Sequence, residues 1–214
     1  MDIELVKKEI ENIPLTAFGK SVPHLRKLGK LIAKGDYKQF LETNSNDTFE
    51  LRMVHAFVLG YAKDDIRTLL NYFEQFMPYV DDWAVNDTLC QSFKVTKNYQ
   101  EEVWEFLMRF RTTTDEFTSR IVSVMLLTHY LNDEYIDRVI EVIDGLNTDE
   151  YYSQMGVAWA IATLISKYPQ KGLDYLHENN LDDKTHRKTL QKIRESYRVS
   201  DEIKSKIKLL RQAH

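Results

Sequence analysis

The sequence contains few of the residues that interrupt helices or cross-link a chain. Its 214 residues include seven glycines, four prolines and one cysteine. Glycine and proline both fall below average usage, and sparse turn residues favour long helices over a β fold with many turns. The single cysteine, Cys90, cannot form an internal disulfide. A reducing compartment, the cytoplasm, is therefore the expected location.

Long apolar runs and ligand motifs are also missing. No run of about 18 apolar residues occurs, so no transmembrane helix is predicted. The start, MDIELVKKEIENI, is an amphipathic helix of mixed charge without the apolar core of a signal peptide. The six histidines are scattered, and there is no HExxH, CxxC or phosphate-binding glycine loop. We expect a monomer without a metal or cofactor.

Positive charge is scarce except at the C-terminal end. The net charge of the chain is -4, but residues 184–214 alone carry ten Lys/Arg and three Asp/Glu. Such asymmetry is typical of an end that meets an anion. A solvated terminal helix is the alternative interpretation.

Aromatic residues recur at a spacing of 34 residues. The positions are Phe49, Trp83, Phe117 and Tyr151, with Thr185 one step further. An aspartate precedes each of the five by two residues, at Asp47, Asp81, Asp115, Asp149 and Asp183. Each aspartate is predicted to cap the N-terminus of a helix.

Further helical patterns lie between these starts, near residues 65–77, 99–111, 133–144 and 170–178. The unit is therefore helix, turn, helix, repeated about five times. The repeat has the length of a TPR but lacks the TPR residue pattern. The sequence predicts an all-α fold: a HEAT-like α-solenoid of antiparallel helix pairs, in a single domain of residues 1–214, with a concave groove.

One position of the repeat carries an unexpected carboxylate. Four residues after the aromatic position stand Met53, Asp87, Ile121, Met155 and Thr189. Three of the five are large and apolar, so this position is expected to face a neighbouring helix. A carboxylate at such a position costs several kcal/mol unless it is paired. Asp87 is therefore either a functional group or a cap or bridge to a neighbouring helix.

The preceding position of the repeat holds only non-acidic polar residues. They are Arg52, Asn86, Arg120, Gln154 and Lys188. On equivalent helices these side chains would form a row of hydrogen-bond donors, which suits phosphate oxygens. A solvated helix face of chance composition is the alternative.

Two tryptophans lie on the predicted repeat helices, Trp83 at a helix start and Trp159 eight residues into another. A tryptophan on a helix commonly belongs to the core, but its π face can also contact a sugar or a cation. Trp104 is predicted to be a core residue of a connecting helix.

Together these residues resemble the AlkD-like family of DNA alkylation-repair proteins. The motif of Trp, three residues and Asp is Trp83-Ala-Val-Asn-Asp87 here. The family arginine before an apolar run corresponds to Arg120 in TSRIVSVMLL, and the second tryptophan to Trp159 in SQMGVAWAIAT. The upstream segment FGKSVPHLRKLGK is also similar to the family. The resemblance covers nearly the whole chain in the expected order.

The resemblance implies a DNA glycosylase that hydrolyses the N-glycosidic bond of cationic N3- and N7-alkylpurines in duplex DNA, without an enclosing base pocket. Asp87 would then stabilise the oxocarbenium-like sugar and position a water molecule. Trp83 and Trp159 would flank the sugar and backbone, and Arg120 would bind a phosphate. Arg52 and Lys188 are further candidates for DNA binding.

Some positions differ from the family pattern. Met155 stands where the family has a lysine, and Ala162 stands where it has an arginine. The segment before Gly19 has room for one helix, where typical members have an additional one that contacts DNA. Each difference reduces the capacity to neutralise phosphates. A catalytically inactive HEAT-like homologue that acts as a binding scaffold is therefore the alternative function.

Overall fold

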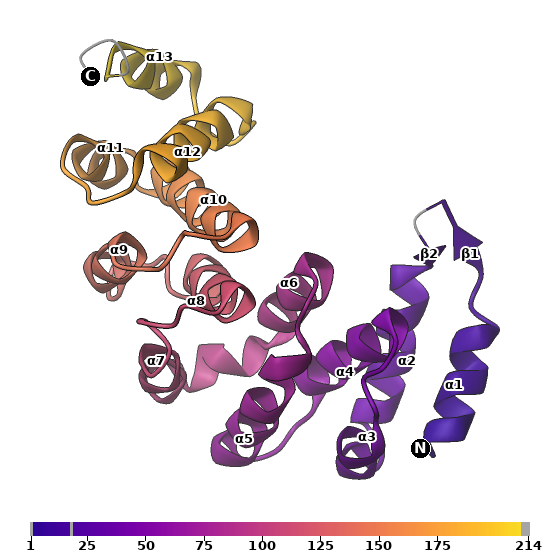
Figure 1. Cartoon of the computed structure of the whole chain (residues 1–214). Coiled ribbons are helices and arrows are strands. Elements are labelled where there is room, and N and C mark those ends of the chain that lie inside the picture. The colour runs from indigo at the N-terminus through magenta and orange to yellow at the C-terminus, as the bar shows by residue number, and fades with distance from the viewer. Residues whose placement is uncertain (1, 18, 211–214) are drawn as a thin grey trace. The chain divides into compact units, whose positions relative to one another are not determined.

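The structure, a computed structural model, describes residues 2–17 and 19–210. Phe18, which opens the FGKSVPHLRKLGK segment, and Arg211 of the basic end lie outside the described residues. The described residues form thirteen α-helices, two short 3-10 helices and one two-stranded hairpin (Figure 1). The predicted all-α class is confirmed. The chain divides into two compact units, residues 1–106 and 107–214.

The first unit begins with α1 and a small hairpin. Its elements are α1 (Ile3–Glu11), β1 (Leu15–Thr16), β2 (Gly19–Lys20), α2 (Val22–Ala33), α3 (Tyr37–Thr43), α4 (Phe49–Tyr61), α5 (Ile66–Phe76), η1 (Met77–Tyr79), α6 (Trp83–Ser92) and η2 (Lys94–Asn98). In the antiparallel hairpin Leu15 pairs with Lys20 and Thr16 with Gly19. Helix α4 packs against both α2 and α6. Helix α7 (Gln100–Met108) begins in this unit and ends in the next.

The second unit repeats this packing with longer helices. Its elements are α8 (Glu116–His129), α9 (Ile136–Asp144), α10 (Tyr151–Lys167), α11 (Pro169–His177), α12 (Asp183–Glu195) and α13 (Asp201–Leu210). Helix α10 packs against both α8 and α12 (Figure 1). No described helix is long and apolar enough to cross a membrane.

The helices that start at the 34-residue spacing are α4, α6, α8, α10 and α12, here called the repeat helices. In α4 every residue from Met53 to Leu59 is buried, as expected for a helix with neighbours on several sides. The helices between them bury one face only: α9 buries Ile136, Val139 and Ile143. Repeat helices thus alternate along the chain with helices that bury one face. The HEAT-like solenoid of antiparallel pairs and its concave groove remain predictions.

The predicted N-caps are correct at only one of the five repeat helices. Asp115 caps α8, accepting a hydrogen bond from the backbone N–H of Thr118 at 2.8 Å. Three other N-cap positions lie one residue later than predicted, at Thr48, Asp82 and Glu150 rather than Asp47, Asp81 and Asp149, and the fourth lies one residue earlier, at Asp182 rather than Asp183.

At α6 and α10 the predicted cap residue interacts with another side chain instead of the helix N-terminus. Asp81 forms an ion pair with Arg52 at 3.2 Å, so Asp82 caps α6 instead. Asp149 accepts a hydrogen bond from Asn147, and Glu150 makes no side-chain cap at α10. There the carboxylate of Glu116 from α8 accepts the backbone N–H of Tyr152. Helix ends satisfied by a neighbouring helix leave no local signature in the sequence.

Two repeat helices of the first unit approach each other closely at Gly60. A Cβ atom at Gly60 of α4 would overlap the Cβ of Ser92 in α6 and lie 2.9 Å from its backbone carbonyl atoms. Backbone atoms cannot rotate away, so any side chain here must push α6 off α4.

We therefore expect Gly60→Ala to lower the free energy of unfolding by about 1–3 kcal/mol, although alanine favours helix by about 1 kcal/mol over glycine. Urea denaturation measures the change. Gly145→Ala is the matched control, because a Cβ at Gly145 meets nothing closer than 3.8 Å. Equal stability of the two variants would contradict the close packing of α4 and α6.

A buried histidine lies between α4 and α5. His55 is 4% exposed and stacks on Phe76 with ring centroids 4.0 Å apart. Its Nδ1 lies 3.3 Å from the side-chain amide of Asn44, and its Nε2 is buried without a hydrogen-bond partner. Burial lowers the pKa of His55 from 6.5 to about 3. The folded protein therefore binds a proton here much more weakly than the unfolded chain.

This difference predicts acid sensitivity. The contribution of neutral His55 to the free energy of unfolding is complete above pH 6.5. It is lost as the pH falls towards 3, by up to about 1.4 kcal/mol per pH unit. Urea denaturation between pH 7 and pH 5 should show this slope in the wild type and a shallower one in His55→Leu. The exposed His177 provides the control, and His177→Gln should keep the wild-type slope. An unchanged slope in His55→Leu would show that another group controls the acid response.

Candidate functional site

Helix α6 begins at Trp83, whose side chain is 50% exposed. The carboxylate of Asp82 accepts the backbone N–H of Ala84 at 2.7 Å and so starts the helix at this residue. Just before it, Asp81 pairs with Arg52 of the neighbouring α4. This ion pair joins the segment before α6 to α4. The backbone next to the exposed indole is therefore held both by the Asp82 cap and by the Asp81–Arg52 ion pair.

Asp87 follows Trp83 by one helical turn and therefore lies on the same side of α6. It is half-buried, as is Met155 at the equivalent position of α10, whereas Met53, Ile121 and Thr189 are fully buried. The position therefore faces a neighbour, as predicted, but solvent still reaches it at Asp87. Partial exposure reduces the free-energy cost of an ionised carboxylate there.

The residues around Asp87 anchor α6 in the core. Asn86 is completely buried, and its side-chain oxygen accepts the thiol of the buried Cys90 at 3.7 Å. Asp87 therefore directly follows a residue whose side chain is buried and hydrogen-bonded inside the core.

Most side chains of the predicted row of donors form hydrogen bonds to other groups of the protein. Arg52 donates to the carbonyl of Asn46 at 2.9 Å in addition to its ion pair with Asp81. Arg120, only 6% exposed, donates to the carbonyl of Tyr152 at 3.1 Å. The side-chain amide of Gln154 donates to the Thr185 hydroxyl at 3.3 Å. Arg120 and Gln154 thus each reach the next repeat helix, and the row joins successive helices of the second unit.

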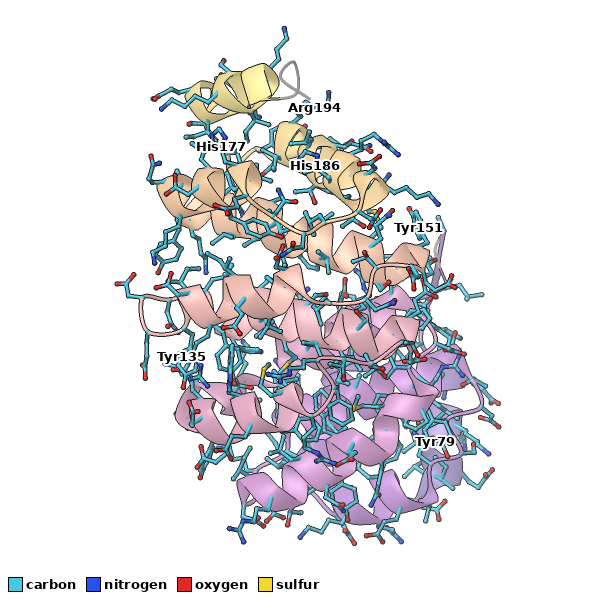
Figure 2. All side chains as sticks on the ribbon, turned by 60° about the vertical axis from the view of Figure 1, so that its left-hand side comes forward. Tyr79, Tyr135, Tyr151, His177, His186 and Arg194 are labelled. Carbon is cyan, nitrogen blue, oxygen red and sulfur yellow. The ribbon has the colours of Figure 1, made fainter. Side chains whose placement is uncertain are left out.

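Lys188, the last residue of the row, lies in a hollow along α12. Its ammonium donates to the side-chain oxygen of Gln191 at 3.2 Å. The hollow, about 410 Å³, is lined by Gln154, Lys184, Arg187, Lys188, Leu190, Gln191 and Arg194. Figure 2 shows the side chains of α12, with His186 and Arg194 labelled. Four basic residues around one hollow are a combination of charges that suits phosphate groups.

Sequence analysis did not single out Lys184, Arg187 or Arg194. Their signal was present, because residues 184, 187, 188, 191 and 194 follow the spacing of one helix face within the basic end. We refer to this feature as the α12 basic hollow.

Trp159 is half-buried on α10, in a second hollow near the C-terminal end of α12. Its position gives it a partly accessible ring. Trp104 is 4% exposed and belongs to the core, as predicted. The described residues contain no group of three or more His, Cys, Asp or Glu placed to hold a metal ion.

The six predicted site residues thus form two sets of three. Arg52, Trp83 and Asp87 lie on the packed pair α4 and α6 of the first unit. Arg120, Trp159 and Lys188 lie on α8, α10 and α12, three successive repeat helices of the second unit.

A family model described as DNA alkylation repair enzyme matches residues 12–197, which include all six residues and most of both units. The chain belongs to this family. Comparison with curated proteins and with solved structures gave no match. Membership in the DNA alkylation repair enzyme family gives the chain a role in DNA repair and makes DNA its substrate.

Proposed function

We propose that this member of the family is a DNA glycosylase that releases cationic N3- and N7-alkylated purines from duplex DNA. The observation that carries the proposal is the Trp83–Asp87 pair: a half-exposed indole and a half-buried carboxylate one turn apart on α6. Both groups favour positive charge, the carboxylate by its own charge and the indole by its π face.

The reaction uses positive charge that the substrate already carries. The glycosidic C–N bond breaks, and its electron pair neutralises the departing alkylated base. The sugar left behind resembles an oxocarbenium ion, which the Asp87 carboxylate stabilises electrostatically. Water then adds to the sugar C1′, and Asp87 orients that water and accepts its proton. Trp83 shields the reacting sugar from bulk solvent on the same side of α6.

The second unit supplies binding. Trp159 presents a partly accessible ring to the sugar-phosphate backbone. Arg120 is almost buried and holds α8 to α10 through Tyr152, so it contributes mainly as a fixed positive charge. Arg52 is likewise tied to Asp81 and positions the start of α6. The α12 basic hollow, with Lys188 in it, binds backbone phosphates.

We expect Asp87→Asn to slow base release by about 100-fold or more, because the amide keeps the shape and loses the charge. Release is measured from a duplex with a single N7-methylguanine under excess protein. Glu105→Gln, which neutralises an exposed acid on α7, should leave the rate unchanged. Wild-type release by folded Asp87→Asn would overturn the role of Asp87. No release by folded wild-type protein would favour the inactive scaffold.

The α12 basic hollow should control the salt dependence of DNA binding. Each of Lys184→Gln and Lys188→Gln is expected to weaken binding to undamaged duplex and to reduce the slope of log affinity against log salt by about 0.9. Fluorescence anisotropy between about 50 and 200 mM salt measures the slope. Lys171→Gln on α11 neutralises an exposed lysine outside the hollow and is the control. Identical slopes in all three variants would remove the hollow from the DNA interface.

A further inference from the structure

A stripe of polar side chains lies along the side of α8 that packs against α10. Its members have the i, i+3, i+4 and i+7 spacing of one helix face: Glu116, Ser119, Arg120 and Ser123. The two serines are completely buried, Arg120 is almost buried and Glu116 is half-buried. Buried polar groups need hydrogen-bond partners. Glu116, Ser119 and Arg120 have theirs at or just before the start of α10, the helix beside α8 (Figure 1).

This polar stripe holds both backbone groups of one residue. The Glu116 carboxylate accepts the backbone N–H of Tyr152, and the Arg120 guanidinium donates to the carbonyl oxygen of the same tyrosine at 3.1 Å. The Ser119 hydroxyl donates to the carbonyl of Asn147, in the segment before α10, at 2.8 Å. The first turn of α10 is therefore attached to α8 at a defined rotation about the helix axis.

Helix α10 depends on α8 for this attachment. Its own N-cap residue, Glu150, makes no side-chain hydrogen bond to the helix, so the carboxylate at the helix start comes from the neighbouring helix. Gly156 leaves room for the polar stripe, because a Cβ atom there would lie 2.4 Å from the Ser123 Oγ and 3.3 Å from the Arg120 Cγ. A side chain at Gly156 would push the two helices apart.

The attached residue lies on the same face of α10 as a candidate site residue. Tyr152, Met155 and Trp159 follow the spacing of one helix face, and all three are half-buried. The ring of Tyr152 stacks on Phe117 of α8, with ring centroids 5.4 Å apart. Seven residues of α-helix make about two turns of a stiff rod. A rotation that is fixed at Tyr152 therefore also fixes the direction of the Trp159 side chain.

We propose that Glu116 is a positioning residue for Trp159. Through the backbone N–H of Tyr152 it sets the rotation of α10 and hence the place of the indole, and Arg120 is the second point of attachment. In this role Glu116 contacts neither sugar nor base. The consequence for the reaction rests on the proposed glycosylase function, which places Trp159 against the sugar-phosphate backbone. The place of the Trp159 ring can be measured without DNA.

Two variants of Glu116 separate its hydrogen bond from its charge. Glu116→Met and Glu116→Gln lose the same charge and have similar length and helix propensity, but only glutamine keeps an oxygen that accepts the Tyr152 N–H. Glu150→Met is the matched control, because Glu150 is exposed, lies at the start of the same helix and makes no cap. Urea denaturation verifies that all three variants are folded.

Fluorine NMR of the full-length protein reports the place of the indole. The chain has three tryptophans, so labelling with 5-fluorotryptophan gives three resonances, each assigned by replacing one tryptophan with phenylalanine. Trp83 and Trp104 lie in the first unit and serve as internal references. We expect Glu116→Met to shift or broaden the Trp159 resonance alone. Glu116→Gln and Glu150→Met should keep the wild-type resonance.

Base release measures the consequence for the reaction, again from a duplex with a single N7-methylguanine under excess protein. We expect Glu116→Met to slow release by about 10-fold, because a misplacement of about 1 Å can cost as much as 100-fold. Glu116→Gln should restore most of the rate. Undamaged duplex should bind both variants with equal affinity, because they carry the same charge.

Three fluorine results would overturn the inference: an unchanged Trp159 resonance in Glu116→Met, an equal change in Glu116→Met and Glu116→Gln, or an equal change at all three tryptophans. An active wild type together with an unchanged release rate in Glu116→Met would also overturn it. A selective change at Trp159 that glutamine prevents, in a protein that releases no base, would keep the positioning and remove the proposed function. Base release with an unchanged Trp159 resonance would do the reverse.

Discussion

Close contact between successive repeat helices is the constraint on which the candidate site depends. Small residues make this contact possible: Gly60 lies against Ser92 where α4 meets α6, and Gly156 lies against Ser123 where α10 meets α8. With the helices this close, a side chain on one helix reaches the backbone of the next, as Arg120 reaches Tyr152. The candidate residues of each unit therefore lie on helices that are in contact, although these residues are far apart in the sequence.

The sequence predicted the class of fold and the places where helices begin, because both depend on local patterns. Phe49, Trp83 and Tyr151 are the first residues of α4, α6 and α10. The cap at Asp115 was predictable, whereas Asp81 and Asp149 interact with other residues and do not cap their helices. The interaction of Asp81 with Arg52 is a contact between helices, which spacing along the chain does not reveal.

The row of donors illustrates a second limit of sequence reasoning. Groups that donate to phosphate oxygens donate equally well to carbonyl and carboxylate oxygens of the next helix. Residue type therefore suits both roles, and only the structure shows that Arg120 and Gln154 bridge helices. The α12 basic hollow was the opposite case. Its residues fell within a basic segment that composition had marked, but their common face appears only once α12 is placed.

The burial of Cys90 has a practical consequence for the study of α6. Its thiol is the only one in the chain and is completely buried. It donates a hydrogen bond to the side chain of Asn86, the residue before Asp87. A thiol-reactive reagent can reach it only when α6 separates locally from its neighbours. The rate of its chemical labelling therefore reports how often the helix that carries Trp83 and Asp87 opens in the folded protein. The native chain thus contains its own kinetic probe of the rigidity of this helix.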